Sequence, residues 1–291
     1  MIYGDKKTGV LVQGATGKQG EFHINLMNAY ARQIGGKGVV AGVTPGKGGK
    51  EVHGVPVYNT VKEAMRDHDI GASVIFVPAA AAADSIMEEA NAGIPTIVTI
   101  TEHIPVHDTM KAIAYARMEG SVVIGPNCPG LLSPGELKMG IMPSGLFSCG
   151  HVGVISRSGT LTYEVVDELT RAGIGQSTVI GIGGDPVIGQ TFTDVLAQFE
   201  KDPQTKAVVL IGEVGGNLEE EGANSTNMPI VSYIAGISAP PDKRMGHAGA
   251  IVEGGEGDAR SKIARLKKLG VPVASRPSEI PEMVRGLFRS C

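Results

Sequence analysis

The feature that most constrains the fold is a regular alternation between short β-branched runs and amphipathic stretches. The runs are rich in Val and Ile and lack polar alternation, which is typical of strands buried on both faces of a parallel sheet. In the first half of the chain, strands are expected at Gly9–Gln13, Val39–Val43, Ser73–Val77, Pro95–Ile100 and Ser121–Gly125. Helices are expected between them at Glu21–Ile34, Ala80–Asn91 and His107–Glu119. This order predicts an α/β fold with a doubly wound parallel sheet.

The same alternation returns in the second half of the chain. Strands are expected at Val152–Ser156, Ser177–Ile182, Ala207–Gly212, Pro229–Ile234 and Val271–Ala274. Helices are expected at Gly159–Ala172, Gln190–Lys201, Asp258–Leu269 and Ser278–Phe288. The pattern predicts a second, flavodoxin-like domain, also with a mainly parallel sheet.

A Pro- and Gly-rich stretch, Gly125–Gly153, separates the two patterns and shows little periodicity. We interpret it as the connection between two domains, with some function of its own. The predicted domains are therefore residues 1–125 and residues 126–291. A chain of this length can bury two cores of ordinary size.

Composition and charge exclude several classes of function. The net charge is −4 and no basic run stands out, so nucleic acid is not an expected partner. The run Glu219-Glu220-Glu221 is interpreted as a solvated helix start. The 3 cysteines form no C-x-x-C pair, which favours a reducing compartment and a cytoplasmic location. No secretory signal is visible, and the apolar runs are too short to cross a membrane.

The first expected strand leads into GATGKQG, Gly14–Gly20, followed by a helix. Glycines let this turn approach a phosphate, and the helix start offers N–H groups to it. A tight turn without a ligand is the alternative. An NAD site would place an acidic residue after the second strand, but Val43–Gly49 carries Lys47 instead. A lysine there suits the additional phosphate of coenzyme A or NADP, or it is a solvated loop residue.

A second group of candidate residues lies in the second half. Ser158 and Gly159 follow a strand and begin a helix, so they form an anion site or a simple N-cap. His247 lies in GHAGA after Lys243 and Arg244, and an imidazole among small residues can carry a phosphoryl group or be structural. Glu213 follows a strand and could fix the tautomer of a histidine, or lie on the surface. No second ligand follows a zinc-like spacing, so no metal site is expected.

These segments together resemble one family, the α subunits of succinyl-CoA synthetase. The matching strings are, in chain order, GATGKQG, VTPGKGG, TITEHIP, GPNCPG, SRSGTLTYE, GIGGDP, IGEVGG and KRMGHAGAI. The match runs from about Gly9 to the C-terminal region. The resemblance implies a Rossmann-like domain that binds coenzyme A, followed by a flavodoxin-like ligase domain.

The resemblance also implies a role for each matched residue. Coenzyme A would contact Thr16, Gly17, Lys18, Gln19, Lys47, Ile100, Thr101 and Glu102. His247 would be the phosphorylated nucleophile, and Glu213 would support its ring. Ser158 and Gly159 would offer a helix N-terminus to phosphate, and Tyr163 would lie near the acid substrate. Cys128 matches a family cysteine and is interpreted as a packing residue.

The implied activity is that of an acid–thiol ligase of the tricarboxylic acid cycle. Succinate, coenzyme A and a nucleoside triphosphate would reversibly give succinyl-CoA, nucleoside diphosphate and phosphate through a phosphohistidine. No G-x-x-x-x-G-K-[ST] string occurs, and the family places the nucleotide and its Mg²⁺ on an ATP-grasp β subunit, so a heteromer is expected. The alternatives are the small subunit of a malate–CoA ligase, a non-catalytic module that binds coenzyme A, and an NADP-dependent oxidoreductase.

Overall fold

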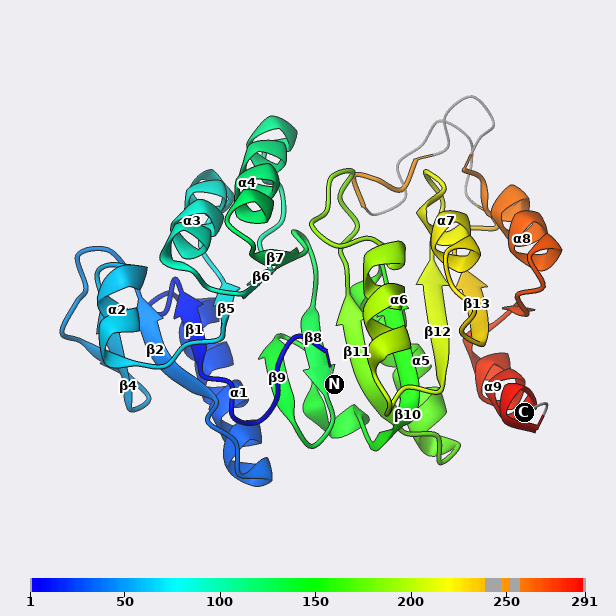
Figure 1. The fold of residues 1–291 in the computed structure, drawn as a ribbon, viewed down its shortest axis with the longest axis horizontal. Coiled ribbons are helices and arrows are strands. Elements are labelled where there is room, and N and C mark those ends of the chain that lie inside the picture. Colours follow the sequence, from blue (N-terminus) through cyan, green and yellow to red (C-terminus); the bar gives the residue numbers. More distant parts are fainter. Residues whose placement is uncertain (1, 239–246, 252–256, 290–291) are drawn as a thin grey trace. The chain divides into compact units, whose positions relative to one another are not determined.

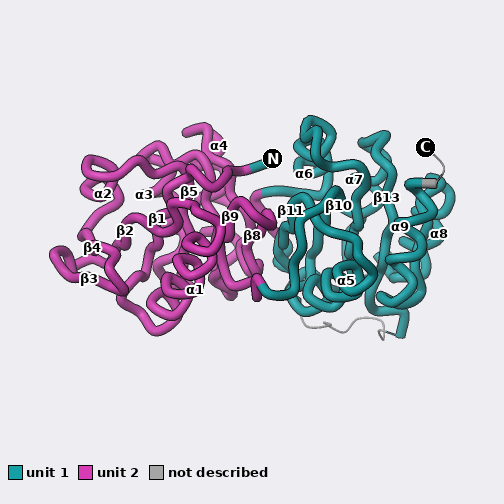
Figure 2. Tube along the Cα trace, turned by 90° about the horizontal axis from the view of Figure 1, so that it is seen from below, with its two compact units in different colours: residues 1–2, 145–186, 190–291 teal, residues 3–144, 187–189 magenta. Residues whose placement is uncertain are grey.

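The computed structural model describes residues 2–238, 247–251 and 257–289 (Figure 1). It forms two compact units (Figure 2). The N-terminal unit, magenta in Figure 2, contains residues 3–144 and 187–189. The C-terminal unit, teal, contains the rest of the described chain. Residues 126–144 therefore pack with the N-terminal unit, although the predicted first domain ends at residue 125.

The sheet of the N-terminal unit has the strand order β3-β4-β2-β1-β5-β6-β7. Its strands are β1 (Val10–Gln13), β2 (Val39–Val43), β3 (Glu51–Val52), β4 (Val55–Tyr58), β5 (Ala72–Ile75), β6 (Thr96–Thr99) and β7 (Val122–Ile124). All neighbouring pairs are parallel except β3 with β4 at the edge. From β4 to β7 this is the order of a dinucleotide-binding fold, with its switch point between β1 and β5.

Four helices cover the two faces of this sheet. They are α1 (Lys18–Ile34), α2 (Val61–Asp67), α3 (Ala79–Ala92) and α4 (Val106–Met118). Helices α2, α3 and α4 lie on one face, and α1 lies on the other (Figure 1). Leu11, Ile75 and Ile97 are fully buried beneath them, as expected of Val- and Ile-rich strands with no polar alternation.

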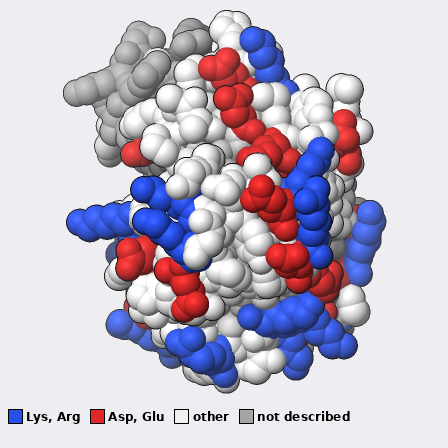
Figure 3. Space-filling model, turned by 90° about the vertical axis from the view of Figure 1, so that its left-hand side faces the viewer, with Lys and Arg blue, Asp and Glu red and all other residues white. Residues whose placement is uncertain are grey.

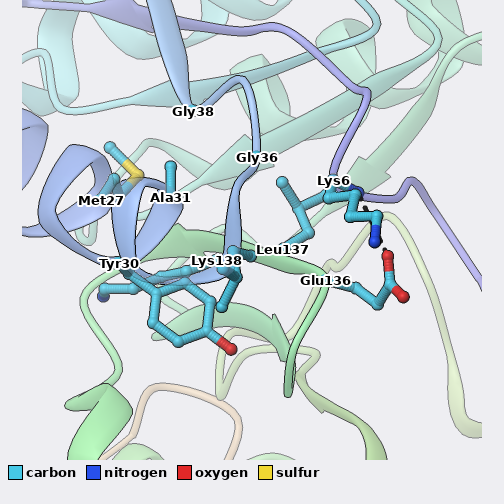
Figure 4. Close-up of a pocket in the computed structure, with 10 residues that line it drawn as sticks. Lys6, Met27, Tyr30, Ala31, Gly36, Gly38, Glu136, Leu137 and Lys138 are labelled. Carbon is cyan, nitrogen blue, oxygen red and sulfur yellow. Dashed lines mark hydrogen bonds between the residues drawn. The ribbon is translucent and has the colours of Figure 1, made fainter.

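A hairpin of β8 (Gly130–Ser133) and β9 (Leu137–Gly140) packs against α1. In Figure 4, Tyr30 of α1 lies beside Lys138 of the hairpin, and the Gly140 N–H of the hairpin donates to Met27 Sδ of α1 at 3.5 Å. The Tyr30 hydroxyl accepts a hydrogen bond from the Gly135 N–H at 2.8 Å. The gap left between them is only about 10 Å³, which holds one water molecule at most, so it is a packing defect.

The C-terminal unit is a second parallel sheet. Its strands β14-β13-β12-β10-β11 lie in this order, and their neighbouring pairs are all parallel. The bounds are β10 (Cys149–Ser156), β11 (Gln176–Gly181), β12 (Ala207–Gly212), β13 (Ile230–Ile234) and β14 (Val273–Ala274). Counted along the chain from β11, the order of these five strands is 2-1-3-4-5, which is flavodoxin-like. The predicted fold class is confirmed for both units.

The helices of this unit again cover both faces. They are α5 (Gly159–Arg171), α6 (Phe192–Lys201), α7 (Leu218–Asn224), α8 (Ala259–Lys268) and α9 (Ile280–Arg289), with short 3₁₀ turns at Ser144–Leu146 and Pro277–Glu279. Helices α6, α7 and α8 pack in sequence on one face, and α5 and α9 pack together on the other (Figure 1). The fully buried Phe192 and Phe199 anchor α6 to the sheet.

The surface drawn in Figure 3 carries basic and acidic side chains interspersed with one another. This mixed pattern agrees with the small net charge of −4. Within the described ranges, no helix has the length and apolar character that crossing a membrane requires.

Candidate active site

The switch point of the C-terminal sheet lies between β10 and β12. Both strands are parallel neighbours, and the chain leaves them toward helices on opposite faces. Ligands in such sheets bind at the carboxyl ends of the strands at this point. Here β10 leads into Arg157 and Ser158, and β12 leads into Glu213. The fold therefore brings these three residues to one edge of the sheet.

His247 lies against the same edge, although it is distant in sequence. Its Nδ1 is 2.9 and 3.0 Å from the two carboxylate oxygens of Glu213. An ionised carboxylate can only accept hydrogen bonds, so Nδ1 carries the proton. In the neutral ring, Nε2 then holds the free lone pair. The predicted pairing of Glu213 with His247 is present in the structure, and it occupies Nδ1 rather than Nε2.

The surroundings of His247 shift its pKa upward. The hydrogen bond to Glu213 is the largest cause, burial opposes it, and the negative charge of Glu213 adds to it. The guanidinium of Arg157 lowers the pKa of His247, and the Asp185 carboxylate raises it. The imidazole side chain remains about a quarter exposed, at 26%, so a ligand can still reach it.

A cavity of about 320 Å³ opens beside the ring. Its lining includes His247, Glu213 and Ser158, together with Thr160, Leu161, Val214, Ala235 and Gly236. Ser158 is the N-cap of α5, and its hydroxyl accepts a hydrogen bond from the Leu161 N–H at 3.4 Å. The first turn of a 13-residue helix thus begins at this cavity, and its N–H groups suit an anion.

Two predicted residues of the same helix are placed differently. Gly159 is the first residue of α5, and Tyr163 is half-buried one turn later. Neither is among the residues that line this cavity. Their predicted contacts with phosphate and acid substrate stay predictions.

Close backbone packing fixes the position of the ring. A Cβ at Gly184, which follows β11, would overlap the His247 imidazole. The Gly184 carbonyl accepts a hydrogen bond from the Gly249 N–H at 3.0 Å, which ties the histidine loop to this strand end. The neighbours Lys243 and Arg244, singled out in the sequence, lie outside the described residues.

Sequence reasoning missed three buried charged residues behind Glu213. Arg157 is 4% exposed, and Glu219 and Lys262 are completely buried. The interpretation of the Glu219–Glu221 run as a solvated helix start was therefore wrong for Glu219 and Glu220, which are buried, whereas Glu221 is exposed. The run does open α7, but Glu219 faces inward because it pairs with Arg157 and Lys262. Only the tertiary fold brings these charges together, so no local sequence pattern predicts that they pair.

The residues expected to bind coenzyme A lie in the N-terminal unit. Gly17 is the N-cap of α1, so Lys18 and Gln19 form its exposed first turn. The predicted helix began at Glu21, and the observed start is one turn earlier. The Thr16 N–H donates to the Thr44 hydroxyl at 3.3 Å, which joins this turn to the loop that carries Lys47.

Ile100, Thr101 and Glu102 follow β6 at the same carboxyl edge of the sheet. The Thr101 hydroxyl donates to the Val77 carbonyl at 2.7 Å, and the Glu102 side chain is exposed. All eight predicted residues thus lie on loops or a helix start that follow β1, β2 or β6. This arrangement is compatible with one elongated ligand, and their contacts with it stay predictions.

The remaining candidates concern thiols and metals. Cys128 is buried, and its thiol lies 3.3 Å from the Thr99 carbonyl. It therefore packs in the interior of the unit. Among the described residues, no group of three or more His, Cys, Asp or Glu side chains could hold a metal ion.

Comparison with known families matches both units. Residues 5–103 match the family described as a CoA binding domain, and residues 155–271 match the family described as CoA-ligase.

Three curated relatives are similar over nearly the whole chain. The succinate–CoA ligase [ADP-forming] subunit alpha 2 of Archaeoglobus fulgidus is 56% identical over 96% of this chain and 97% of its own. The corresponding alpha subunit of Aquifex aeolicus is 52% identical over 98% of this chain and 94% of its own length. The alpha subunit of Methanothermobacter thermautotrophicus is 54% identical over 98% of this chain and 96% of its own length.

Solved structures share the fold at lower identity. ATP citrate lyase from Methanothrix soehngenii, in complex with citrate and coenzyme A, superposes with a TM-score of 0.89 at 21% identity. The alignment covers all of this chain but 51% of that one, so this chain spans about half its length. A dinucleotide-forming acetyl-coenzyme A synthetase from Ca. Korarchaeum cryptofilum superposes with a TM-score of 0.70 at 22% identity. That alignment covers 92% of this chain and 58% of the synthetase. At such identities the likeness concerns the fold.

Proposed function

Because this chain belongs to the family of succinate–CoA ligase α subunits, we propose that it carries a phosphoryl group on His247 during synthesis of succinyl-CoA. The observation that carries the proposal is the His247–Glu213 hydrogen bond beside the N-terminus of α5. It supplies a nucleophile, a group that fixes its tautomer, and donors for the phosphate in one cavity. The names of the relatives favour succinate over malate and favour an enzyme over a passive binding module.

In the proposed sequence, the γ-phosphoryl group of a nucleoside triphosphate moves to Nε2 of His247, and the diphosphate leaves. A succinate carboxylate then attacks phosphorus, which frees the histidine and gives succinyl phosphate. The thiol of coenzyme A attacks the acyl carbon, and phosphate leaves. Covalent catalysis of this kind divides one difficult transfer into easier steps. The N–H groups at Ser158 and Gly159 would balance the charge of the phosphate.

The remaining components are part of the same proposal. Coenzyme A would lie along Thr16–Gln19, Lys47 and Ile100–Glu102, with Tyr163 near the acid. A β subunit of ATP-grasp type would bind the nucleotide and its Mg²⁺, for which the described part of this chain offers no cluster of ligands. The sparse cysteines suit a cytoplasmic location.

Phosphoryl labelling tests this function. The chain co-expressed with its β subunit is incubated with Mg²⁺ and γ-labelled nucleotide, and the bound label is measured after mild acid and after base. A phosphoramidate is lost in acid and survives base, so label on this chain should be acid-labile. His247→Asn should abolish the label, because an amide nitrogen is not nucleophilic.

His151→Asn is the matched control. His151 belongs to the same unit, is exposed, and contacts the Gln204 carbonyl through Nδ1 at 3.0 Å. This variant should be labelled like the wild type. Normal acid-labile labelling of His247→Asn would assign the phosphoryl group to another histidine and refute the proposal.

A further inference from the structure

Four buried charged side chains form a continuous network of ion pairs behind His247. Arg157 Nε lies 3.5 Å from Glu213 Oε1, and Arg157 Nη1 lies 3.3 Å from Glu219 Oε1. The second oxygen of Glu219 pairs with the Lys262 ammonium. Two cations and two carboxylates balance one another, as buried charges must.

The same side chains also hold the backbone on which Glu213 stands. Glu219 Oε1 accepts a hydrogen bond from the Glu213 N–H at 3.1 Å. The Gly215 carbonyl accepts from Arg157 Nη1 at 3.0 Å and from Lys262 Nζ at 2.8 Å. The short loop between β12 and α7 is therefore fixed at its start, Glu213, and at its middle, Gly215, by groups that do not touch the cavity beside His247.

We propose that Arg157, held by Glu219 and Lys262, is a positioning residue for His247 and acts through Glu213. It keeps the carboxylate in place against Nδ1 of the ring, and its positive charge limits how strongly that carboxylate holds a proton on the imidazole. Glu213 alone would favour the imidazolium, which has no lone pair for a phosphoryl group. Arg157 shares the negative charge of Glu213 and so favours the neutral, nucleophilic ring. The significance for phosphoryl transfer rests on the proposed function, whereas the coupling to the ring does not.

The charged groups that face His247 in the described structure come from three elements. Glu213 follows β12, Arg157 follows β10, and Asp185 lies in the loop after β11. Glu213 and Asp185 favour the protonated ring and Arg157 opposes it. Removing Arg157 therefore predicts a more basic His247. If Arg157 served only as packing, its loss would loosen the hydrogen bond to Glu213 and make His247 less basic.

The opposite signs of these two outcomes give a sharp test. The ring of His247 is titrated in the full chain by ¹⁵N-detected NMR, with its signals assigned from the His247→Asn variant. Arg157→Gln leaves Glu219 paired with Lys262 and should raise the pKa of His247 by about 1 unit, as expected for a charge partner this close. Acid-labile labelling of the heteromer should then reach its half-maximal rate at a pH higher by a similar amount.

Glu219→Gln tests the same inference even if the Arg157→Gln protein does not fold. It removes the carboxylate that anchors Arg157, so it should weaken the effect of Arg157 on Glu213, raise the pKa of His247 and shift the half-maximal labelling rate to a higher pH. Glu220→Gln is its matched control, because Glu220 is buried in the same helical turn but pairs with Arg265 at 3.8 Å. The control should leave both readouts unchanged.

An unchanged or lowered pKa of His247 in a folded Arg157→Gln chain would overturn the inference, as would equal behaviour of Glu219→Gln and Glu220→Gln. If the wild-type heteromer takes up no label at all, the proposed function fails, and the NMR titration of the single chain still decides whether Arg157 acts on His247.

Discussion

Glu89 shows how one buried carboxyl group can make stability depend on pH. It is completely buried on α3, where it accepts a hydrogen bond from the Ser73 hydroxyl. Burial raises the pKa of Glu89 from 4.5 to about 8, and the hydrogen bond from Ser73 opposes this shift. The folded protein therefore holds a proton at neutral pH that the unfolded chain releases.

We predict that the free energy of unfolding falls as pH rises between the unfolded and folded pKa values of Glu89. The slope should be about 1.4 kcal/mol per pH unit, because one proton is bound only in the folded state. Glu89→Gln cannot titrate, so its stability relative to the wild type should improve over pH 5 to 8. Urea unfolding of both proteins at several pH values measures this, and parallel curves would contradict it.

The sequence predicted the residues at the centre of the candidate site better than those behind them. Glu213 lies in a recognisable string at the end of a strand and His247 lies in a recognisable loop string, and the structure joins them. Arg157 lies in the string SRSGTLTYE, but its partner Glu219 is 62 residues away. Such a pair depends on the register of two parallel strands and one helix, which no local spacing encodes.

At the scale of elements, the length of a helix or strand decided whether its sequence pattern could predict it. The long amphipathic helices and the Val-rich strands were expected and are present. The two-residue β3, the seven-residue helices α2 and α7, and the hairpin β8–β9 are too short for a period to emerge. The hairpin lies in the stretch interpreted as a connection, where a Gly- and Pro-rich composition concealed two strands.

The turn between β1 and α1 is the element on which binding of coenzyme A is predicted to depend. Gly20 lies in the first turn of α1, and a Cβ there would overlap the Gly14 carbonyl. Gly20→Ala should displace this turn, weaken coenzyme A binding about tenfold or more, and cost about 1 to 3 kcal/mol of stability. Calorimetric titration and urea unfolding measure the two effects.

Gly286→Ala is the matched control for that substitution. Gly286 is also helical, and a Cβ there would meet open space, so alanine should leave coenzyme A binding unchanged and stabilise α9 slightly. Wild-type affinity in a folded Gly20→Ala chain would show that this turn does not bind the ligand.

At the scale of the whole molecule, the proposed site residues are divided between the two units. The N-terminal unit contains the turn proposed to bind coenzyme A, and the C-terminal unit contains His247 and the N-terminus of α5. No group of three metal-binding side chains that could hold Mg²⁺ lies in the described ranges, and the sequence contains no G-x-x-x-x-G-K-[ST] string. The two α/β folds and their order could be predicted from the sequence, because each repeats its strand–helix alternation several times.

The two-subunit proposal predicts that the chain purified alone binds coenzyme A but does not turn over. The single chain should bind coenzyme A, because all predicted contacts come from its own loops, yet form no succinyl-CoA with succinate and ATP or GTP. Addition of the β subunit should restore turnover, and a heteromer that contains His247→Asn should stay inactive while it still binds coenzyme A. Calorimetry and a thioester assay on the same preparations measure both properties. Turnover by the single chain at a rate similar to that of the heteromer would mean that this chain binds and activates the nucleotide itself, and the two-subunit proposal would be wrong.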